Sequence, residues 1–143
     1  MKKIAIFFTI IILIVAGIAY MSINLKINNA QIDKENAFYE NYYKREITGG
    51  EVATLINKAI DSNTKNEIPK DKKGVFIENE SNSIKIDFKM LDDDKIYNME
   101  VFHKNGIMNF VEYYRNIKFK CTQIDYHEQT KRVSHMLVEQ ITK

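Results

Sequence analysis

The chain has 143 residues, with 21 lysines and arginines, 19 aspartates and glutamates, and a formal net charge of +2. This length allows one small domain with a single hydrophobic core, and the single cysteine, Cys121, excludes an internal disulfide. The folded part must therefore be stabilised by packing. Frequent Asn, Ile and Lys residues are typical of proteins from AT-rich bacterial genomes.

The first segment favours a membrane location. Lys2 and Lys3 precede 18 residues without a charge, from Ile4 to Met21. At about 1.5 Å per residue, a helix of this length nearly crosses a hydrocarbon core roughly 30 Å thick. We therefore predict a transmembrane anchor over residues 4–21. A cleaved signal peptide with a cleavage site at Gly17-x-Ala19 is the alternative, although its apolar run would end after about 7–15 residues.

The distribution of charge sets the expected orientation. Lys2 and Lys3 flank one end of the anchor, whereas only Lys26 lies close to the other end. Because positive residues stay on the cytoplasmic side, residues 1–3 should form a cytoplasmic tip and the rest should lie outside the cell. The two N-terminal lysines account for the whole positive excess, so the exterior part is formally neutral. A neutral exterior excludes nucleic acid as a partner.

A helix is expected to continue beyond the membrane. Residues 22–45 contain no glycine or proline, and apolar residues recur there at helical spacing. We predict one helix over 3–45, in which residues 22–45 form a stalk. Tyr39, Tyr42 and Tyr43 would lie about 30 Å from the membrane. We expect these tyrosines to pack on the exterior domain, and a partner-binding aromatic patch is the alternative.

Gly49 and Gly50 are expected to end this helix. Thr48 and Glu51 have the spacing of a capping box, in which each side chain bonds to a backbone N–H of a new helix, predicted over 50–62. Its apolar stripe should face the core and consists of Val52, Leu55, Ile56 and Ala59. The polar stretch that follows, residues 64–73, holds the only proline and should be a loop.

Alternating apolar residues predict four strands. These strands run over 74–79, 83–91, 117–127 and 132–139. A hairpin turn at 79–82 should join the first two, and a bulge near Thr122 or Gln123 would keep the third strand in phase. Apolar residues at helical spacing also predict a helix over 106–115 and a shorter helical turn over 98–104.

These elements predict an α+β fold of order α-α-β-β-α-β-β. Residues 46–143 should form one extracytoplasmic domain, in which helices cover one side of a four-stranded antiparallel sheet. The polar residues that alternate with the apolar ones should face water on the other side.

The last two predicted strands carry the residues with the most reactive side chains, Cys121, His127 and His135. Zinc sites need three or four such ligands at converging positions, and these residues lack the short spacings of zinc motifs. Cys121 shares a strand face with Ile117 and Phe119, which favours a small core residue over a nucleophile. We therefore predict neither a metal site nor a cysteine nucleophile.

Acidic residues offer no clear site either. The run Asp92 to Asp94 is similar to the start of a calcium loop, but Tyr97 and His103 occupy the positions at which an EF-hand has glycine and glutamate. Glu78 and Glu80 lie in or beside the hairpin turn, without the apolar surroundings that would raise a carboxyl pKa. The five glycines form no phosphate-binding loop. The sequence therefore predicts no catalytic, cofactor-binding or metal-binding residue.

The segment from Phe38 to Lys58 resembles a stretch of small single-pass membrane proteins of Gram-positive bacteria. It reads Phe-Tyr-Glu-Asn-Tyr at 38–42 and Ile-Thr-Gly-Gly-Glu-Val-Ala-Thr-Leu-Ile-Asn-Lys at 47–58. The shared pattern is an aromatic residue, a glycine and then Thr-Gly-x-Glu-Val-x-x-Leu-Ile, and Lys44 stands here at the position of the first glycine. The resemblance implies a membrane-anchored bacterial protein. Because its motif is a capped helix, it carries no active site.

We expect a non-enzymatic accessory or protein-interaction subunit at the bacterial surface, held in the bilayer by Ile4 to Met21. A pilin-like structural subunit is the first alternative, because a long N-terminal helix packed on an antiparallel sheet is also the layout of type IV pilins. Pilins place a glutamate near the start of that helix, whereas no acidic residue precedes Asp33 here. A surface-tethered hydrolase using His127 or His135 is the second alternative.

Overall fold

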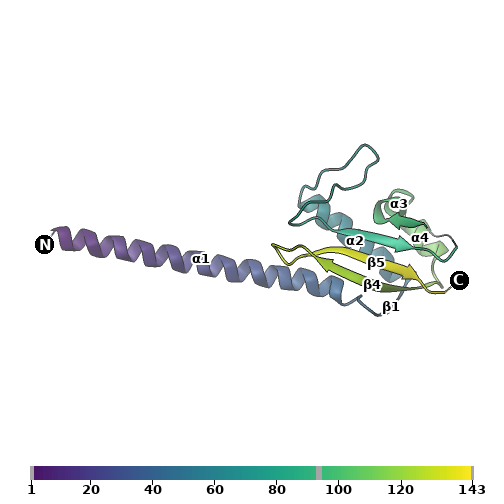
Figure 1. Ribbon diagram of the computed structural model, residues 1–143, viewed down its shortest axis with the longest axis horizontal. Helices are drawn as coiled ribbons and strands as arrows, with labels where there is room; N and C mark the ends of the chain where they lie inside the picture. Colours follow the sequence, from purple (N-terminus) through teal and green to yellow (C-terminus); the bar gives the residue numbers. More distant parts are fainter. Residues whose placement is uncertain (1, 93–94, 143) are drawn as a thin grey trace. The chain divides into compact units, whose positions relative to one another are not determined.

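The computed structural model describes residues 2–92 and 95–142, and the chain divides into two compact units (Figure 1). The first unit is Met1–Lys34 and the second is Glu35–Lys143. Helix α1 (Lys2–Glu40) forms the described part of the first unit, and its last residues belong to the second. The second unit contains helices and a sheet, which confirms the predicted α+β class.

Helix α1 ends at Glu40 rather than at the predicted residue 45. Lys44 has a φ of 58°, and this left-handed residue turns the chain into strand β1 (Glu46–Thr48). The prediction that Gly49 and Gly50 end the helix is wrong, because both glycines are the first residues of the next helix. Residues 22–45 contain no glycine or proline, and the prediction took this as a sign that the helix runs to residue 45. The helix nevertheless ends five residues earlier.

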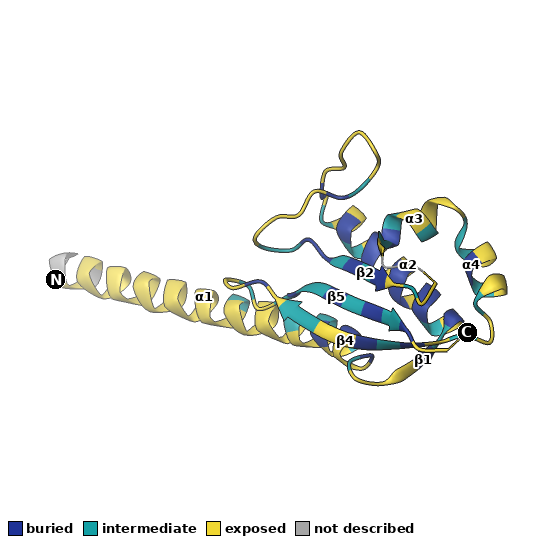
Figure 2. Cartoon of the chain, turned by 45° about the vertical axis from the view of Figure 1, so that its right-hand side comes forward, coloured by how far each residue is buried: buried dark blue, intermediate teal, exposed yellow. Residues whose placement is uncertain are grey.

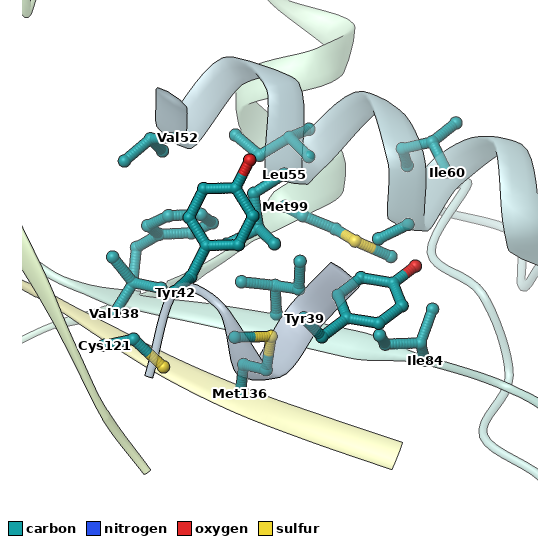
Figure 3. Close-up of a cluster of buried hydrophobic side chains, with 14 of the residues drawn as sticks. Tyr39, Tyr42, Val52, Leu55, Ile60, Ile84, Met99, Cys121, Met136 and Val138 are labelled. Carbon is teal, nitrogen blue, oxygen red and sulfur yellow. The ribbon is translucent and has the colours of Figure 1, made fainter. Parts of the chain in front are cut away.

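Helix α2 (Gly49–Lys65) begins with the predicted capping box. The Thr48 N–H donates to Glu51 Oε2 at 2.9 Å, and the Glu51 N–H donates to Thr48 Oγ1 at 3.4 Å. The apolar stripe is fully buried as predicted, at Val52, Leu55, Ile56 and Ala59. In Figure 3, side chains from this helix point into the core of the second unit. The capping box thus fixes where this helix starts, and the buried stripe fixes which face packs on the core.

The C-terminus of α2 has the two hydrogen bonds of a Schellman motif. Glu67 has a φ of 54°, and its N–H donates to the Thr64 carbonyl oxygen at 3.1 Å. The Ile68 N–H donates to the Asn63 carbonyl oxygen at 3.0 Å. These bonds satisfy carbonyl groups that the helix itself cannot pair.

Asn63 also connects α2 to the sheet. Its side chain is fully buried, donates to the Ile84 carbonyl oxygen at 2.7 Å and accepts from the Ile84 N–H at 2.8 Å. One amide therefore satisfies both backbone groups of a buried residue just before strand β2 (Lys85–Lys89).

The predicted strand over 74–79 and the hairpin turn after it are wrong. The Ile77 N–H donates to the Pro69 carbonyl oxygen at 2.8 Å, so this segment pairs with the residues just before it. Only Phe76 of its apolar residues is buried, whereas Ile77 is 49% exposed. Asn79 then closes a local turn, because its Oδ1 accepts three consecutive backbone N–H groups. A short alternation does not specify which segment will be its partner.

The sheet has five strands in the order β1-β4-β5-β2-β3. The strands not yet introduced are β3 (Ile96–Asn98), β4 (Lys118–Tyr126) and β5 (Val133–Gln140). Strand β2 runs parallel to β5, and the other neighbours are antiparallel. The predicted four-stranded antiparallel sheet is therefore wrong in strand number and in one direction. The two unpredicted strands, β1 and β3, have three residues each, too few for an alternation to be recognised.

Several local predictions are confirmed in the second half of the chain. A register shift between Cys121 and Gln123 places a bulge at the predicted point of β4. Helix α3 (Met99–Lys104) is the predicted short helical turn, and Asn98 caps it by accepting from the Val101 N–H. Helix α4 (Ile107–Tyr113) lies within the predicted range 106–115.

The core of the second unit lies between α2 and one face of the sheet (Figure 2, Figure 3). That face contributes the fully buried side chains Ile86, Phe88, Phe119, Met136 and Val138. Tyr39 and Tyr42 are only 5% and 7% exposed, which confirms that these tyrosines pack on the domain. The opposite face of the sheet carries charged residues, such as Lys120 opposite Glu139.

Candidate functional site

The exposed apolar surface of α1 is the first candidate for a functional feature. Between Ile4 and Ile27, its large apolar side chains are 40% to 70% exposed (Figure 2). The helix is long and apolar enough to cross a membrane. The exposed apolar residues continue past the predicted end at Met21, to Ile23, Leu25 and Ile27. A single helix of this kind near the N-terminus is compatible with a transmembrane anchor and also with a signal sequence.

The last residues of α1 are bonded into the second unit. Asn36 is nearly buried, donates to the Lys131 carbonyl oxygen at 2.7 Å and accepts from the Val133 N–H at 2.9 Å. Beside it, Arg132 forms an ion pair with Glu35. Residues 35–40 are therefore fastened to the turn between β4 and β5 by a buried amide and a half-buried ion pair.

A polar cleft of about 480 Å³ brings together several side chains that could act as acids, bases or metal ligands. It is lined by His127, His135, Glu78 and Glu80, together with Tyr126 and Ser134. Cys121 is not among its lining residues. The two histidines and two of the carboxylates therefore share one cleft, whereas the thiol lies in the core.

His127 acts as a connection between two loops. Its side chain is buried, and its Nε2 lies 2.7 Å from the Ser83 carbonyl oxygen. Because a carbonyl oxygen only accepts, this nitrogen must carry a proton and donate. The nearby Thr130 hydroxyl donates to the Ser81 carbonyl oxygen at 2.6 Å. Both contacts join the β4–β5 turn to the segment before β2.

His135 lies between two carboxylates. Its Nδ1 is 3.0 Å from Asp125 Oδ2, and its Nε2 is 3.2 Å from Asp87 Oδ2. The hydrogen bond with Asp87 is the largest cause that raises the pKa of His135, and the bond with Asp125 adds to it against the effect of burial. Lys85 also pairs with Asp87 at 3.3 Å. With both ring nitrogens engaged, His135 has the geometry of a charged cross-link between β2, β4 and β5 rather than of a free general base.

Cys121 is a core residue, as predicted. Its side chain is fully buried, and its Sγ donates to the Gln123 carbonyl oxygen at 3.3 Å. Burial raises the pKa of the thiol to about 11, which keeps it protonated at neutral pH.

Acidic residues form no metal cluster in the described ranges 2–92 and 95–142, since no group of three or more His, Cys, Asp or Glu side chains there is placed to hold a metal ion. Asp93 and Asp94 of the acidic run lie outside the described residues.

Helix α4 presents apolar side chains to solvent. Met108 is 74% exposed and Tyr113 is 77% exposed. Tyr113 lines a hollow of about 340 Å³ together with Phe102 and Phe110. Exposed aromatic and methionine side chains of this kind are enriched at protein interfaces.

Sequence reasoning missed the two buried amides, Asn36 and Asn63. Asn63 lies four residues after Ala59, on the apolar stripe of α2, so an amide on a buried face was the available signal. The partners of Asn36 and Asn63 come from distant segments, which spacing does not reveal. No family model, curated protein or solved structure matches this chain.

Proposed function

We propose that this chain is a single-pass bacterial membrane protein with a cytoplasmic N-terminus, whose exterior domain is a non-enzymatic accessory or protein-interaction subunit. The observation that carries the proposal is the exposed apolar surface of α1 from Ile4 to Ile27. Leaving apolar surface in water costs about 25 cal/mol per Å². A bilayer removes that cost for the whole segment at once. Lys2 and Lys3 at its start favour a cytoplasmic N-terminus.

The contacts of the reactive side chains support a non-enzymatic role. His127 and His135 use ring nitrogens to hold loops and strands together, and the Cys121 thiol is buried. An activated nucleophile would instead need an accessible thiol or hydroxyl beside a base with a free nitrogen. The exposed Met108 and Tyr113 on α4 support an interaction role.

Protease treatment of intact cells tests the topology. With an epitope at the C-terminus, protease should remove the epitope from whole cells while a cytoplasmic marker stays intact. Alkaline carbonate should leave the protein in the membrane pellet. An epitope that is protected in intact cells and lost only after lysis would contradict the orientation. A form in the culture medium that lacks the first twenty residues would contradict the anchor.

A photo-crosslinking amino acid at Tyr113 tests the interaction role. We expect a discrete cross-linked band from position 113 in living cells and none from Lys118, which is exposed on β4. Equal labelling from both positions, or from neither, would contradict a specific protein contact on α4.

A pilin-like subunit is the second candidate, favoured by the packing of Tyr39, close to the end of the long helix, on the domain. Polymers that contain this chain in sheared surface fractions would support it. A chain that stays with the membrane after shearing would support the accessory role.

A further inference from the structure

A second cleft, of about 620 Å³, gathers positive charge from two distant parts of the second unit. Lys70, Lys72 and Lys73 line it from the loop after α2, and His103 and Lys104 line it from the end of α3. Among the described residues, Glu100 is the one acidic residue of the lining. The exterior part of the chain is formally neutral, so this concentration of charge is a local feature.

The loop that carries the lysines is held in place by its own hydrogen bonds. Asp71 Oδ1 accepts from the N–H groups of Lys73 and Val75, each at 2.9 Å. The Asp71 N–H donates to the Val75 carbonyl oxygen at 2.8 Å. Asp71 is therefore engaged mainly with the backbone of its own turn. The bond from the Val75 N–H is the largest cause that lowers the pKa of Asp71, and the nearby charge of Lys73 adds to it.

One contact between the loop and α3, and one within the loop, hold the lining of the cleft in place. The Phe76 N–H donates to Glu100 Oε1 at 3.1 Å, which joins the loop to α3. Lys70 Nζ lies 4.3 Å from the centre of the Phe76 ring. Lys72, Lys73 and Lys104 form no ion pair with any other residue in the described part of the chain.

We propose that this cleft binds a phosphate group, carried by a small phosphate ester or by a lipid headgroup. Lysine ammonium groups bind phosphate as point charges, and a group of them favours a dianion over a carboxylate. The cleft lies within the size range of small-ligand sites, about 300–1,000 Å³. Apolar lining from Ile60 and Val101 can contact the carbon part of the ester. This inference goes beyond the proposed function and does not depend on the anchor.

The test titrates glycerol 3-phosphate into the full-length protein held in phosphatidylcholine nanodiscs, with backbone amide resonances as the readout. We expect saturable shifts in residues 70–76 and 100–104, weakened by salt, and a much weaker response to acetate. A second arm uses nanodiscs that contain phosphatidic acid, whose headgroup is also a phosphate monoester. Shifts in the same residues without added ligand would identify the lipid headgroup as the source, whereas shifts only with soluble ester would identify a free ligand.

Matched variants separate a site from general charge. The double variant Lys72→Glu, Lys73→Glu should weaken phosphate binding about tenfold. Two attractive contacts between an ammonium group and the phosphate are lost, and the new carboxylates repel the phosphate. The control Arg115→Glu, Lys118→Glu has the same net charge change on exposed residues that do not line the cleft and should stay within about twofold. Both doubles should unfold at the temperature of the parent protein, since all four side chains are exposed.

The variant Glu100→Gln gives an effect of opposite sign. The amide oxygen can still accept the Phe76 N–H, while the single negative charge of the lining is removed. Phosphate should then bind about two- to fivefold more tightly. Absence of saturable shifts in both arms, equal losses in the two double variants, or weaker binding in Glu100→Gln would overturn the proposal.

Discussion

Three non-glycine residues in the described part of the chain have left-handed backbone conformations, Lys44, Glu67 and Lys131. An L-residue with a side chain pays for this conformation, whereas glycine does not. Each of the three stands at a turn that closes an element: the end of α1, the end of α2 and the β4–β5 connection. Local backbone strain at these residues is therefore part of how the chain reverses direction.

Glu67 allows a direct test of this strain. Glu67→Gly should stabilise the protein by about 0.5–1 kcal/mol, because glycine suits the left-handed position of a Schellman motif. Urea unfolding of the full-length protein in neutral detergent, followed by circular dichroism, measures the change. Glu67→Gln removes the same charge without relaxing the backbone and should leave stability nearly unchanged. An equal gain in both variants would show that charge rather than backbone conformation is responsible.

Within the elements, two adjacent glycines at the start of α2 differ in their surroundings. A Cβ on Gly49 would lie 2.4 Å from the Tyr114 carbonyl oxygen, whereas a Cβ on Gly50 would meet nothing closer than 4.0 Å. Gly49 is therefore required by the close approach of the chain just after α4. Gly50 has no such requirement.

Alanine at each glycine should act in opposite directions. Gly49→Ala should destabilise the protein by about 1–3 kcal/mol, since backbone atoms must move to admit the new methyl group. Gly50→Ala should stabilise it by up to about 1 kcal/mol through helix propensity. Thermal unfolding of the two variants beside the parent protein compares them. The interpretation fails if both substitutions shift the midpoint in the same direction.

Strands β2, β4 and β5 share an ionic cluster around His135. Asp87, Asp125, Lys85 and Glu78 are the charged groups that pair within it. Burial alone would raise the pKa of Asp87, but its bonds to His135 and Lys85 lower it overall. The bond from His135 lowers the pKa of Asp125. The histidine and the two aspartates therefore favour each other's charged forms.

Stability should depend on pH through this cluster. Because the folded-state pKa of His135 is raised, its contribution is fully present below the unfolded value of about 6.5 and is lost as pH rises through the folded value. The contribution of the two aspartates is present above about pH 3.9 and is lost as pH falls through their lowered values. The cluster should therefore contribute most to the free energy of unfolding between about pH 4 and 6.5.

His135→Gln measures that dependence. Urea unfolding of the parent protein should show stability falling as pH rises above about 6.5, and the variant should show a smaller fall. His103→Gln, at an exposed position, is the matched control and should keep the fall seen in the parent protein. If stability falls with pH as steeply in His135→Gln as in the parent protein, the cluster does not explain the pH dependence.

For the whole molecule, the proposed membrane retention rests on the length of uncharged helix. Aspartate near the bilayer centre costs about 2.5–3.5 kcal/mol per residue for insertion. The double variant Ile12→Asp, Leu13→Asp should therefore move the protein from the membrane pellet to the carbonate supernatant. Ile12→Ala, Leu13→Ala keeps the segment uncharged and should leave the protein in the pellet. Retention of the aspartate variant would argue that another part of the chain holds it there.

The sequence by itself determined the features that depend on neighbours along the chain. The uncharged run of α1, the Thr48–Glu51 capping box, the buried stripe of α2 and the bulge in β4 follow from local spacing, and the structure contains each of them. Hydrogen bonds within a helix and alternation along one strand require no information from distant residues.

Tertiary structure alone decided which segments pair. Residues 74–79 alternate as a strand does, yet they pair with the residues just before them, and β2 takes β5 as a parallel neighbour. Asn63, Asn36 and the two histidines find partners more than ten residues away or on other strands. The lysines and His103 that line the second cleft come from two segments far apart in the chain. Side-chain spacing records which face of a segment is buried but not what is buried against it, so these contacts arise only when the whole core is assembled.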